Sequence, residues 1–199
     1  MMTITYAQEA DYSLLPGEFM IFEPEADIYI PYGCYHCSSE KYLIGIRIDS
    51  STNSADSSIF YLSKDIMEQE FPCYNLGPSV MGSIIVERMN GQSVCYTMQQ
   101  EEITITRSLG LGESSLFYTC SNGNYITSTV VLHEPEAFLG IIDSVKVFSL
   151  QMHESSGNPS ENQINNYIVK LSKNHGLIQF FNIRDFPGAV DGTFYVSRS

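Results

Sequence analysis

The sequence predicts an all-β protein, either an antiparallel β-sandwich or an open curved β-barrel with one or two short helical turns. Three observations predict this class. Turn dipeptides typical of β-hairpins recur along the chain, the segments between them alternate apolar and polar residues, and helical periodicity is sparse. The chain of 199 residues is within the usual size of one domain. We therefore expect residues 8–199 to form a single β-rich domain.

Hairpin turns are the clearest local signal. A type I′ turn needs two residues at positive φ, which Asn-Gly and Asp-Gly adopt readily. Asn90-Gly91 separates two strand-length segments, residues 82–89 and 92–98. In the same way Asn122-Gly123 separates residues 115–120 from 125–131, and Asp191-Gly192 precedes residues 193–196. We expect two hairpins and a weaker third.

Period-two alternation marks further strands, because successive side chains of a strand point to opposite faces. This alternation is present in residues 42–49, 102–107 and 145–148. Residues 177–183 are instead almost continuously apolar, which predicts a strand that is buried on both faces.

The remaining segments predict short helical turns and loops. Residues 63–70, capped by Ser63, are expected to form two helical turns, and residues 135–139 one turn. Residues 50–58 and 154–166 are rich in Ser, Asn and Asp and are expected to be exposed loops.

Charge and hydropathy exclude two classes of partner. Ten basic and 23 acidic residues give a formal charge of −13, which repels nucleic-acid phosphates and anionic membrane surfaces. No apolar run approaches the roughly 18–20 residues of a membrane-spanning helix. We expect no nucleic-acid partner and no membrane span.

The first residues predict export. Thr5 and Ala7 form the small-x-small pattern of a signal-peptidase site, so residues 1–7 are interpreted as a signal-peptide remnant. The protein is then expected to be secreted or at the cell surface.

Five cysteines, at positions 34, 37, 73, 95 and 120, would tend to pair in an oxidising compartment. Cys34 and Cys37 form a CxxC motif, for which three alternatives stay open: a structural disulfide, a metal site with His36, or a thiol-disulfide centre. The motif leads into a strand-like segment, whereas a redox CxxC opens a helix. No second ligand pair completes a zinc site. Cys73 and Cys95 are the other candidate disulfide pair.

No motif of catalysis or cofactor binding is present. His36, His133, His153 and His175 lack a nucleophile elbow or a second metal-binding His. Glu101 and Glu102 suggest a glycosidase pair, but adjacent residues of a strand point to opposite faces. We expect no catalytic residue, no cofactor and no metal. The Tyr and Phe residues suit either sheet packing or a glycan- or peptide-binding surface.

Three segments resemble uncharacterised exported proteins of the Bacteroidetes, many of which end in a type IX secretion sorting domain. They are residues 103–114 followed by Asn122-Gly123, residues 139–150, and residues 169–183 followed by Asp185-Phe186-Pro187. The third looks like the "SKNYGLI" strand-turn-strand of that group, with His175 in place of Tyr. The resemblance covers about half of the chain and is to the amino-terminal β-rich region of such proteins. It implies an exported surface module and supplies no catalytic residue.

These observations together predict a non-catalytic exported module that contacts a glycan, a peptide or another surface, as in adhesion. A second hypothesis is a hydrophobic-ligand carrier, because residues 172–178 faintly resemble the return strand of lipoprotein-carrier half-barrels. A third is a thiol-disulfide oxidoreductase that uses Cys34 and Cys37.

Overall fold

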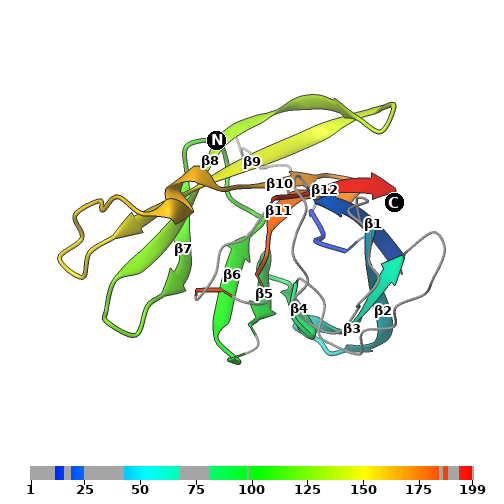
Figure 1. The fold of residues 1–199 in the computed structure, drawn as a ribbon, viewed down its shortest axis with the longest axis horizontal. Coiled ribbons are helices and arrows are strands. Elements are labelled where there is room, and N and C mark those ends of the chain that lie inside the picture. Colours follow the sequence, from blue (N-terminus) through cyan, green and yellow to red (C-terminus); the bar gives the residue numbers. More distant parts are fainter. Residues whose placement is uncertain are drawn as a thin grey trace, which may run out of the picture.

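The fold is that of a computed structural model, which describes residues 12–15, 19–24, 43–67, 81–97, 99–183, 186–187 and 193–198. The described residues form twelve antiparallel strands and one short 3-10 helix (Figure 1). The prediction of an all-β antiparallel protein is confirmed. The elements are β1 (Phe19–Pro24), β2 (Leu43–Asn53), β3 (Ser57–Met67), β4 (Ile84–Arg88), β5 (Gln92–Tyr96), β6 (Glu102–Thr106), β7 (Ser114–Thr119), β8 (Tyr125–Phe138), β9 (Ile141–His153), η1 (Gln163–Asn166), β10 (Ile168–Ser172), β11 (Gly176–Phe181) and β12 (Thr193–Arg198).

The sheet is an up-and-down meander that is open at one place. Its strand order is β6-β5-β4-β3-β2-β1-β12-β11-β10-β9-β8-β7, so strands adjacent in the chain pair with each other. β1 pairs with β12, with Pro24 opposite Phe194, and this pairing joins the two halves of the chain. In the described residues no ladder joins β6 to β7. The strongly curved sheet in Figure 1 is therefore not closed into a barrel.

The β8–β9 hairpin is the longest in the described sheet and ends in an isolated ribbon. β10 pairs with β9 only between Ser149 and Val145, so the end of the hairpin beyond Val145 is two-stranded. Figure 1 shows this ribbon projecting along the top of the molecule. Leu139 (φ 48°) and Gly140 (φ 78°) both have positive φ at its turn, as a type I′ turn requires.

One hydrophobic cluster is built from residues of both halves of the chain. β11 is the most deeply buried strand, with Leu177, Phe180 and Phe181 fully buried. The Phe117 ring of β7 lies 6.1 Å from that of Phe181 and 6.4 Å from that of Phe186, at tilted or edge-on angles favourable for aromatic pairs. The predicted burial of residues 177–183 on both faces is confirmed for β11.

Two cations are buried beside the connection between β6 and β7, residues 107–113. Lys146 is 0% exposed, and its Nζ donates hydrogen bonds to the carbonyl oxygens of Arg107 (3.0 Å) and Leu109 (2.9 Å). Arg107 is 3% exposed and donates to the carbonyl oxygens of Tyr12 and of Arg88. The Tyr12 ring covers the Lys146 ammonium at 4.6 Å. These contacts tie the connection to β9.

The predicted hairpins are confirmed, with a different turn geometry. β4–β5 and β7–β8 surround Asn90-Gly91 and Asn122-Gly123, but only Gly91 (φ 80°) and Gly123 (φ 85°) of these four residues have positive φ. Neither turn is therefore type I′. Each Asn instead accepts a hydrogen bond through its side-chain oxygen from the backbone N–H two residues later, at 3.2 Å and 3.0 Å. The Asp191-Gly192 turn lies outside the described residues.

The predicted helical turns are wrong. Residues 63–67 belong to β3, residues 68–70 lie outside the described part, and residues 135–138 belong to β8. The predicted exposed loop of residues 50–58 is shorter than expected: β2 extends to Asn53 and β3 begins at Ser57, so only residues 54–56 connect the two strands. Pairing between long strands prevailed over weak local signals at these places. The 3-10 helix η1 lies in the predicted loop of residues 154–166, where it buries Ile164.

Candidate functional site

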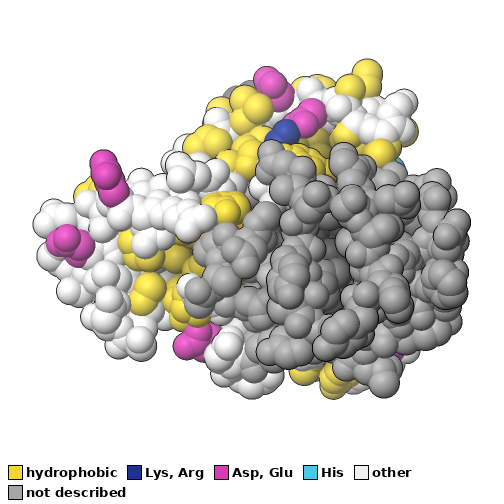
Figure 2. Space-filling view, viewed as in Figure 1, with side chains coloured by type: hydrophobic (Ala, Val, Ile, Leu, Met, Phe, Trp, Pro, Cys, Tyr) yellow, Lys and Arg dark blue, Asp and Glu magenta, His cyan; other side chains and the backbone are white. Residues whose placement is uncertain are grey.

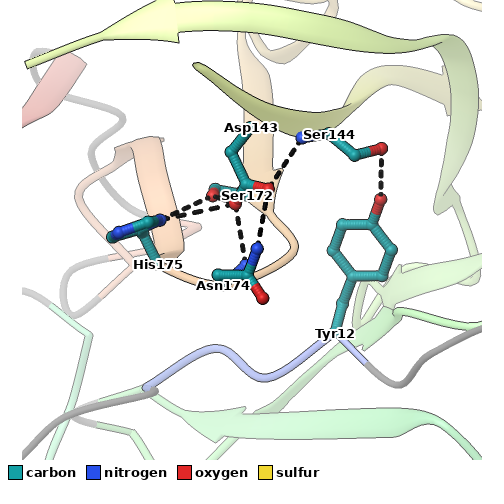
Figure 3. Close-up of polar contacts among 6 residues, drawn as sticks. All are labelled: Tyr12, Asp143, Ser144, Ser172, Asn174 and His175. Atoms are coloured by element: carbon teal, nitrogen blue, oxygen red, sulfur yellow. Dashed lines mark hydrogen bonds and ion pairs between the residues drawn. The ribbon is translucent and has the colours of Figure 1, made fainter. Parts of the chain in front are cut away.

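A polar cluster around Asp143 is the densest set of side-chain hydrogen bonds in the described residues (Figure 3). Asp143 is near the start of β9 and is 9% exposed. It faces the turn between β10 and β11. Asn174 of that turn donates to Asp143 through its backbone N–H (2.8 Å) and its side-chain amide (2.9 Å). Ser172 donates its hydroxyl to Oδ2 of Asp143, and Nδ1 of His175 lies 3.4 Å from the same oxygen.

These donors determine the charge state of Asp143. Burial alone would raise the pKa of this carboxyl group, because the charged form loses hydration. Hydrogen bonds from Ser172, from the backbone of Asn174 and Ser144, and from His175 outweigh burial and lower the pKa from 3.8 to about 2. Asp143 is therefore ionised at neutral pH and holds the β10–β11 turn against β9.

A second group of polar side chains adjoins this cluster through Ser144. The Tyr12 hydroxyl lies 3.0 Å from Oγ of Ser144 and 2.9 Å from Nε2 of His133, and the last two atoms are 3.2 Å apart. Figure 3 shows Tyr12 reaching Ser144 from the opposite side of the cluster to His175. The contacts attach residues 12–15 to the β8–β9 hairpin.

Ser172, His175 and Asp143 are the residue types of a nucleophilic triad, but their arrangement differs from one. In a triad the imidazole bridges the two others through its two nitrogens. Here Ser172 donates directly to Asp143, and Nδ1 of His175 faces both Oγ of Ser172 (3.4 Å) and the carboxylate. Ser172 is fully buried, so its hydroxyl is closed to a substrate. The cluster caps a turn.

A second candidate site lies at the open place in the sheet, between β6 and β7. We call it the seam groove, a cavity of about 270 Å³. Its lining comes from the two strands and the residue before β6. The lining residues are Glu101, Glu102, Thr104, Leu116, Phe117, Tyr118 and Thr119.

The β6 edge of the seam groove presents unpaired backbone groups. In an antiparallel ladder, residues that exchange hydrogen bonds alternate with residues whose N–H and C=O point away. Thr97 N donates to Glu101 O (3.0 Å) and Arg107 N donates to Gly91 O (2.7 Å), which places residues 101, 103, 105 and 107 in hydrogen-bonded positions toward β5. The backbone groups of Glu102 and Thr104 therefore face outward, whereas the outward carbonyl of Thr106 accepts a hydrogen bond from Leu109 N (3.4 Å).

The β7 edge has the same property near its end. Cys120 N donates to Asn124 O (2.8 Å), so the preceding residue, Thr119, is in a position that does not bond to β8. The register of β7 against β8 shifts between Leu116 and Tyr118, just before Thr119. The free edge of β7 is therefore short, and it faces the β6 side of the groove.

Two tyrosine hydroxyls hold the two carboxylates of the groove. Tyr118 donates to Oε2 of Glu101 (2.6 Å), and Tyr96 donates to Oε1 of Glu102 (3.1 Å). Burial, and then the bonded carboxylate, raise the pKa of both tyrosines above its ordinary value of 10, so both stay neutral at physiological pH. The donors orient the carboxylates without neutralising them. Acidic side chains are also spread over the described surface in Figure 2.

Glu101 and Glu102 both border the seam groove, but their side chains bond to different strands. Glu101 accepts a hydrogen bond from the buried Tyr118 of β7, and the exposed Glu102 accepts one from Tyr96 of β5. Glu101 shares the alternation of Ile103, and Glu102 that of Thr104, in agreement with the expected opposite faces. No sequence signal marks the groove itself, because it depends on two strands failing to pair.

The cysteine predictions are only partly covered by the described residues. Cys34, Cys37 and Cys73 lie outside them, as does His36. Cys95 is a free thiol and fully buried, so a Cys73–Cys95 disulfide is not supported. Burial, and secondarily Glu87, raise the pKa of Cys95 to about 12. Cys120 is free and partly exposed.

Each histidine in the described residues has a hydrogen-bonding partner. His133 contacts Tyr12, His175 contacts Asp143, and His153 lies 3.0 Å from Oγ1 of Thr127 while stacking on Tyr125. Within the described ranges no group of three His, Cys, Asp or Glu side chains is placed to hold a metal ion. In the same ranges no helix is long and apolar enough to cross a membrane.

The chain matches no protein-family model, no curated protein and no solved structure. The function is therefore inferred from the geometry of the two candidate sites.

Proposed function

We propose that the protein is a non-catalytic exported binding module that holds an extended segment of another protein at the seam groove. The observation that carries this proposal is the pair of free strand edges, β6 and β7, which lie side by side without a ladder between them. An extended peptide binds such an edge by continuing the sheet, and its main-chain hydrogen bonds supply the affinity.

The two edges lack several features that block strand addition. Proteins commonly protect edge strands with Lys, Pro, bulges or very short strands. Neither β6 nor β7 contains Lys or Pro. β6 is five residues long, and the register shift in β7 follows Leu116. These limits restrict the docked segment to a few residues beside Thr104 or Thr119.

The size of the groove favours a peptide over a buried small molecule. Its volume of about 270 Å³ is below the 300–1,000 Å³ typical of small-molecule sites. It is suited to one or two side chains of a docked strand. Its lining mixes two carboxylates and two threonines with Leu116, Phe117 and Tyr118, whereas the pocket of a lipid carrier is predominantly apolar. β9 and β11 contribute Val145, Phe148 and Leu177 to the packed core.

The absence of catalysis is part of the proposal and is supported by the Asp143 cluster. The hydrogen bonds among Ser172, His175 and Asp143 cap a turn, and the Ser172 side chain is fully buried. For Cys34 and Cys37 we predict no thiol-disulfide catalysis, and an insulin-reduction assay of the protein and of its double Ser variant checks this prediction: turnover that is lost in the variant would contradict it.

Export, with secretion or surface display, rests on the sequence pattern at residues 1–7 and on the resemblance to exported Bacteroidetes proteins. Of the two predicted pairs, Cys73–Cys95 is not supported, so export predicts a disulfide between Cys34 and Cys37 in protein secreted by its native host. Mass spectrometry under non-reducing conditions checks this, and five free thiols there would argue against export.

Peptide docking is tested by selecting random nine-residue peptides, displayed on phage, against the immobilised protein. Thr104→Pro and Thr119→Pro each remove one outward N–H and leave the inner ladders intact. Enriched peptides are expected to bind the wild type, Thr104→Val and Thr119→Val equally, and to lose at least about tenfold in affinity for a Pro variant, which corresponds to one or two hydrogen bonds.

A second measurement does not depend on the folding of the Pro variants. N-methylation of alternate amides in an enriched peptide blocks pairing along one of its edges while leaving the protein unchanged. Methylation of one set of alternate amides is expected to abolish binding, and methylation of the other set is expected to leave binding unchanged. Equal binding of both methylated forms, or of both Pro variants and the wild type, would contradict docking at β6 and β7.

A further inference from the structure

We propose that Asn122 is a site of spontaneous deamidation in the folded protein, which converts it to aspartate and isoaspartate, whereas Asn90 is protected. Both residues are followed by Gly, which has no side chain to hinder attack by its own backbone nitrogen. Both Asn-Gly steps lie in hairpin turns with the Gly at positive φ, 85° and 80°. The surroundings of each turn therefore decide which of the two reacts. The modification is independent of the seam groove.

The reaction needs only the chain, hydroxide and water. The backbone nitrogen of the Gly gives its proton to hydroxide and attacks Cγ of the preceding Asn. The new N–Cγ bond closes a succinimide ring, and the side-chain nitrogen takes a proton from water and leaves as ammonia. Water then opens the ring at one of its two carbonyl carbons. Cleavage of the N–Cγ bond gives aspartate, and cleavage of the original peptide bond gives isoaspartate, whose main chain is one carbon longer.

The Asn122 turn combines activation of the amide with freedom to rearrange. Oδ1 of Asn122 accepts a hydrogen bond from the backbone N–H of Asn124 at 3.0 Å, and this donor stabilises the negative charge that develops on Oδ1 during attack. Asn122 and Gly123 are both exposed. A carbon in the Cβ position of Gly123 would meet only Cβ of Ser155, at 3.5 Å, which is an ordinary contact. The ring can therefore close without displacing a packed neighbour.

The Asn90 turn has the same activation but is held on two sides. Oδ1 of Asn90 accepts from the backbone N–H of Gln92 at 3.2 Å, and its Nδ2 also donates to Oε1 of Gln92 at 3.0 Å. Gly91 is buried, and its carbonyl oxygen accepts from the backbone N–H of Arg107 at 2.7 Å. A carbon in the Cβ position of Gly91 would lie only 2.6 Å from Cβ of Ser108. Ring closure here must break these contacts and displace the start of the connection between β6 and β7.

The two turns thus differ in restraint and share their intrinsic reactivity. In each, the attacking N–H donates to the carbonyl oxygen three residues earlier, at 3.0 Å for Gly123 and 3.1 Å for Gly91, so the loss of this bond slows both sites alike. At Asn90 the side-chain bond to Gln92 and the bond from Arg107 must also be given up. Two additional hydrogen bonds correspond to a rate about tenfold lower at Asn90.

Modification at Asn122 changes the turn that closes the β7–β8 hairpin. Aspartate adds a negative charge to an already acidic chain. Isoaspartate lengthens the main chain between Cys120 and Asn124, where the backbone N–H of Cys120 donates to the carbonyl oxygen of Asn124 at 2.8 Å. The same turn is attached to the loop after β9, because the side chain of Asn124 accepts from the backbone N–H of Ser155 at 3.1 Å.

The two sites can be measured in one digest of the full-length protein. Trypsin cleaves after Arg88, Arg107 and Lys146, which places Asn90 and Asn122 on separate peptides. The protein is incubated at pH 8 and sampled over time, and aspartate and isoaspartate forms of each peptide are separated by chromatography and quantified by mass spectrometry. In the folded protein Asn122 is expected to react about tenfold faster than Asn90. In guanidinium chloride the two rates should converge, because the restraining contacts are lost.

A variant tests the cause of the protection. Gln92→Val removes the acceptor of the Asn90 side-chain nitrogen and keeps a residue that favours a strand. It is expected to accelerate deamidation of Asn90 severalfold and to leave the rate at Asn122 unchanged. Thr104→Val is the matched control, because it also places Val in a strand of the same sheet but lies away from both turns, and it should change neither rate.

Several results would overturn the proposal. Equal rates at the two sites of the folded protein, or a faster reaction at Asn90, would contradict the protection of Asn90 by its surroundings. A rate difference that persists undiminished in guanidinium chloride would show that flanking sequence, and not the fold, causes it. An unmodified Asn122 in folded protein, over a period in which the denatured chain reacts, would show that this turn is closed to the reaction as well.

Discussion

The buried ammonium group of Lys146, on β9, donates a hydrogen bond to the carbonyl oxygen of Arg107, at the end of β6, over 3.0 Å. The same group donates to Leu109, two residues later in the connection to β7. Lys146 therefore fixes the start of this connection against β9, although it lies outside the lining of the seam groove.

Lys146→Met is expected to destabilise the protein by about 2–3 kcal/mol, because two buried carbonyl groups lose their donor. Urea denaturation followed by circular dichroism measures this. Lys170→Met is the control: Lys170 is partly exposed and its contact is an ion pair with Glu136 at 2.6 Å, for which a loss below about 1 kcal/mol is expected. Equal losses in the two variants would contradict the role given to Lys146.

Asp143→Asn should lower the free energy of unfolding at neutral pH and make it depend less on pH in the acidic range. The pKa of Asp143 is lowered in the folded state to about 2, from 3.8. A lowered pKa contributes stability that is complete above about pH 4 and is lost as the pH falls toward 2. The wild type is thus expected to be about 2 kcal/mol more stable than the variant at pH 7, and this difference should shrink between pH 4 and pH 2. A constant difference would show that the carboxylate charge is not responsible.

The two described thiols should differ in reactivity toward iodoacetamide. Cys95 is fully buried and its pKa is raised to about 12, so its peptide should be alkylated only after unfolding. Burial, and then the charge of Glu101, raise the pKa of the partly exposed Cys120. Glu101→Gln removes the second cause and should accelerate alkylation of Cys120 at pH 8, with Glu113→Gln as the control. Mass spectrometry of the digested protein measures both, and an unchanged rate would place Glu101 too far from the thiol.

Leu139→Asn is expected to stabilise the β8–β9 hairpin by about 0.5–1 kcal/mol. Leu139 is 49% exposed and has φ 48°, a left-handed conformation that costs a leucine about 1–2 kcal/mol and that Asn tolerates better. Thermal and urea unfolding measure the gain. A loss of stability would show that Leu139 packs against a neighbour strongly enough to outweigh the strain.

Local sequence predicted those parts of the fold whose causes are local. Asn90-Gly91 and Asn122-Gly123 each locate a reversal, since an Asn side chain and a Gly at positive φ stabilise a turn within a few residues. The continuous apolar run of β11 predicted its burial on both faces. The strand-turn-strand pattern of residues 169–183 predicted the reversal between β10 and β11.

The errors arose where distant strands decide a local conformation. Residues 135–138 were expected to be helical, but they pair along β9 and form the end of a long hairpin. Residues 63–67 similarly pair with β2. The energy of each ladder is shared along the whole strand, so a weak helical preference of a few residues cannot prevail.

The sequence by itself therefore determined the strand class, two hairpin turns and the acidic net charge. Only the tertiary structure decided that Asp143 caps a turn 31 residues away, that Lys146 is buried against Arg107, and that β6 and β7 form an open seam. Turns and alternation depend on neighbouring residues, which the sequence displays directly. Burial, the positions of charged side chains and the lack of pairing between β6 and β7 depend on which distant segments come into contact. Those contacts are fixed only when the whole sheet folds.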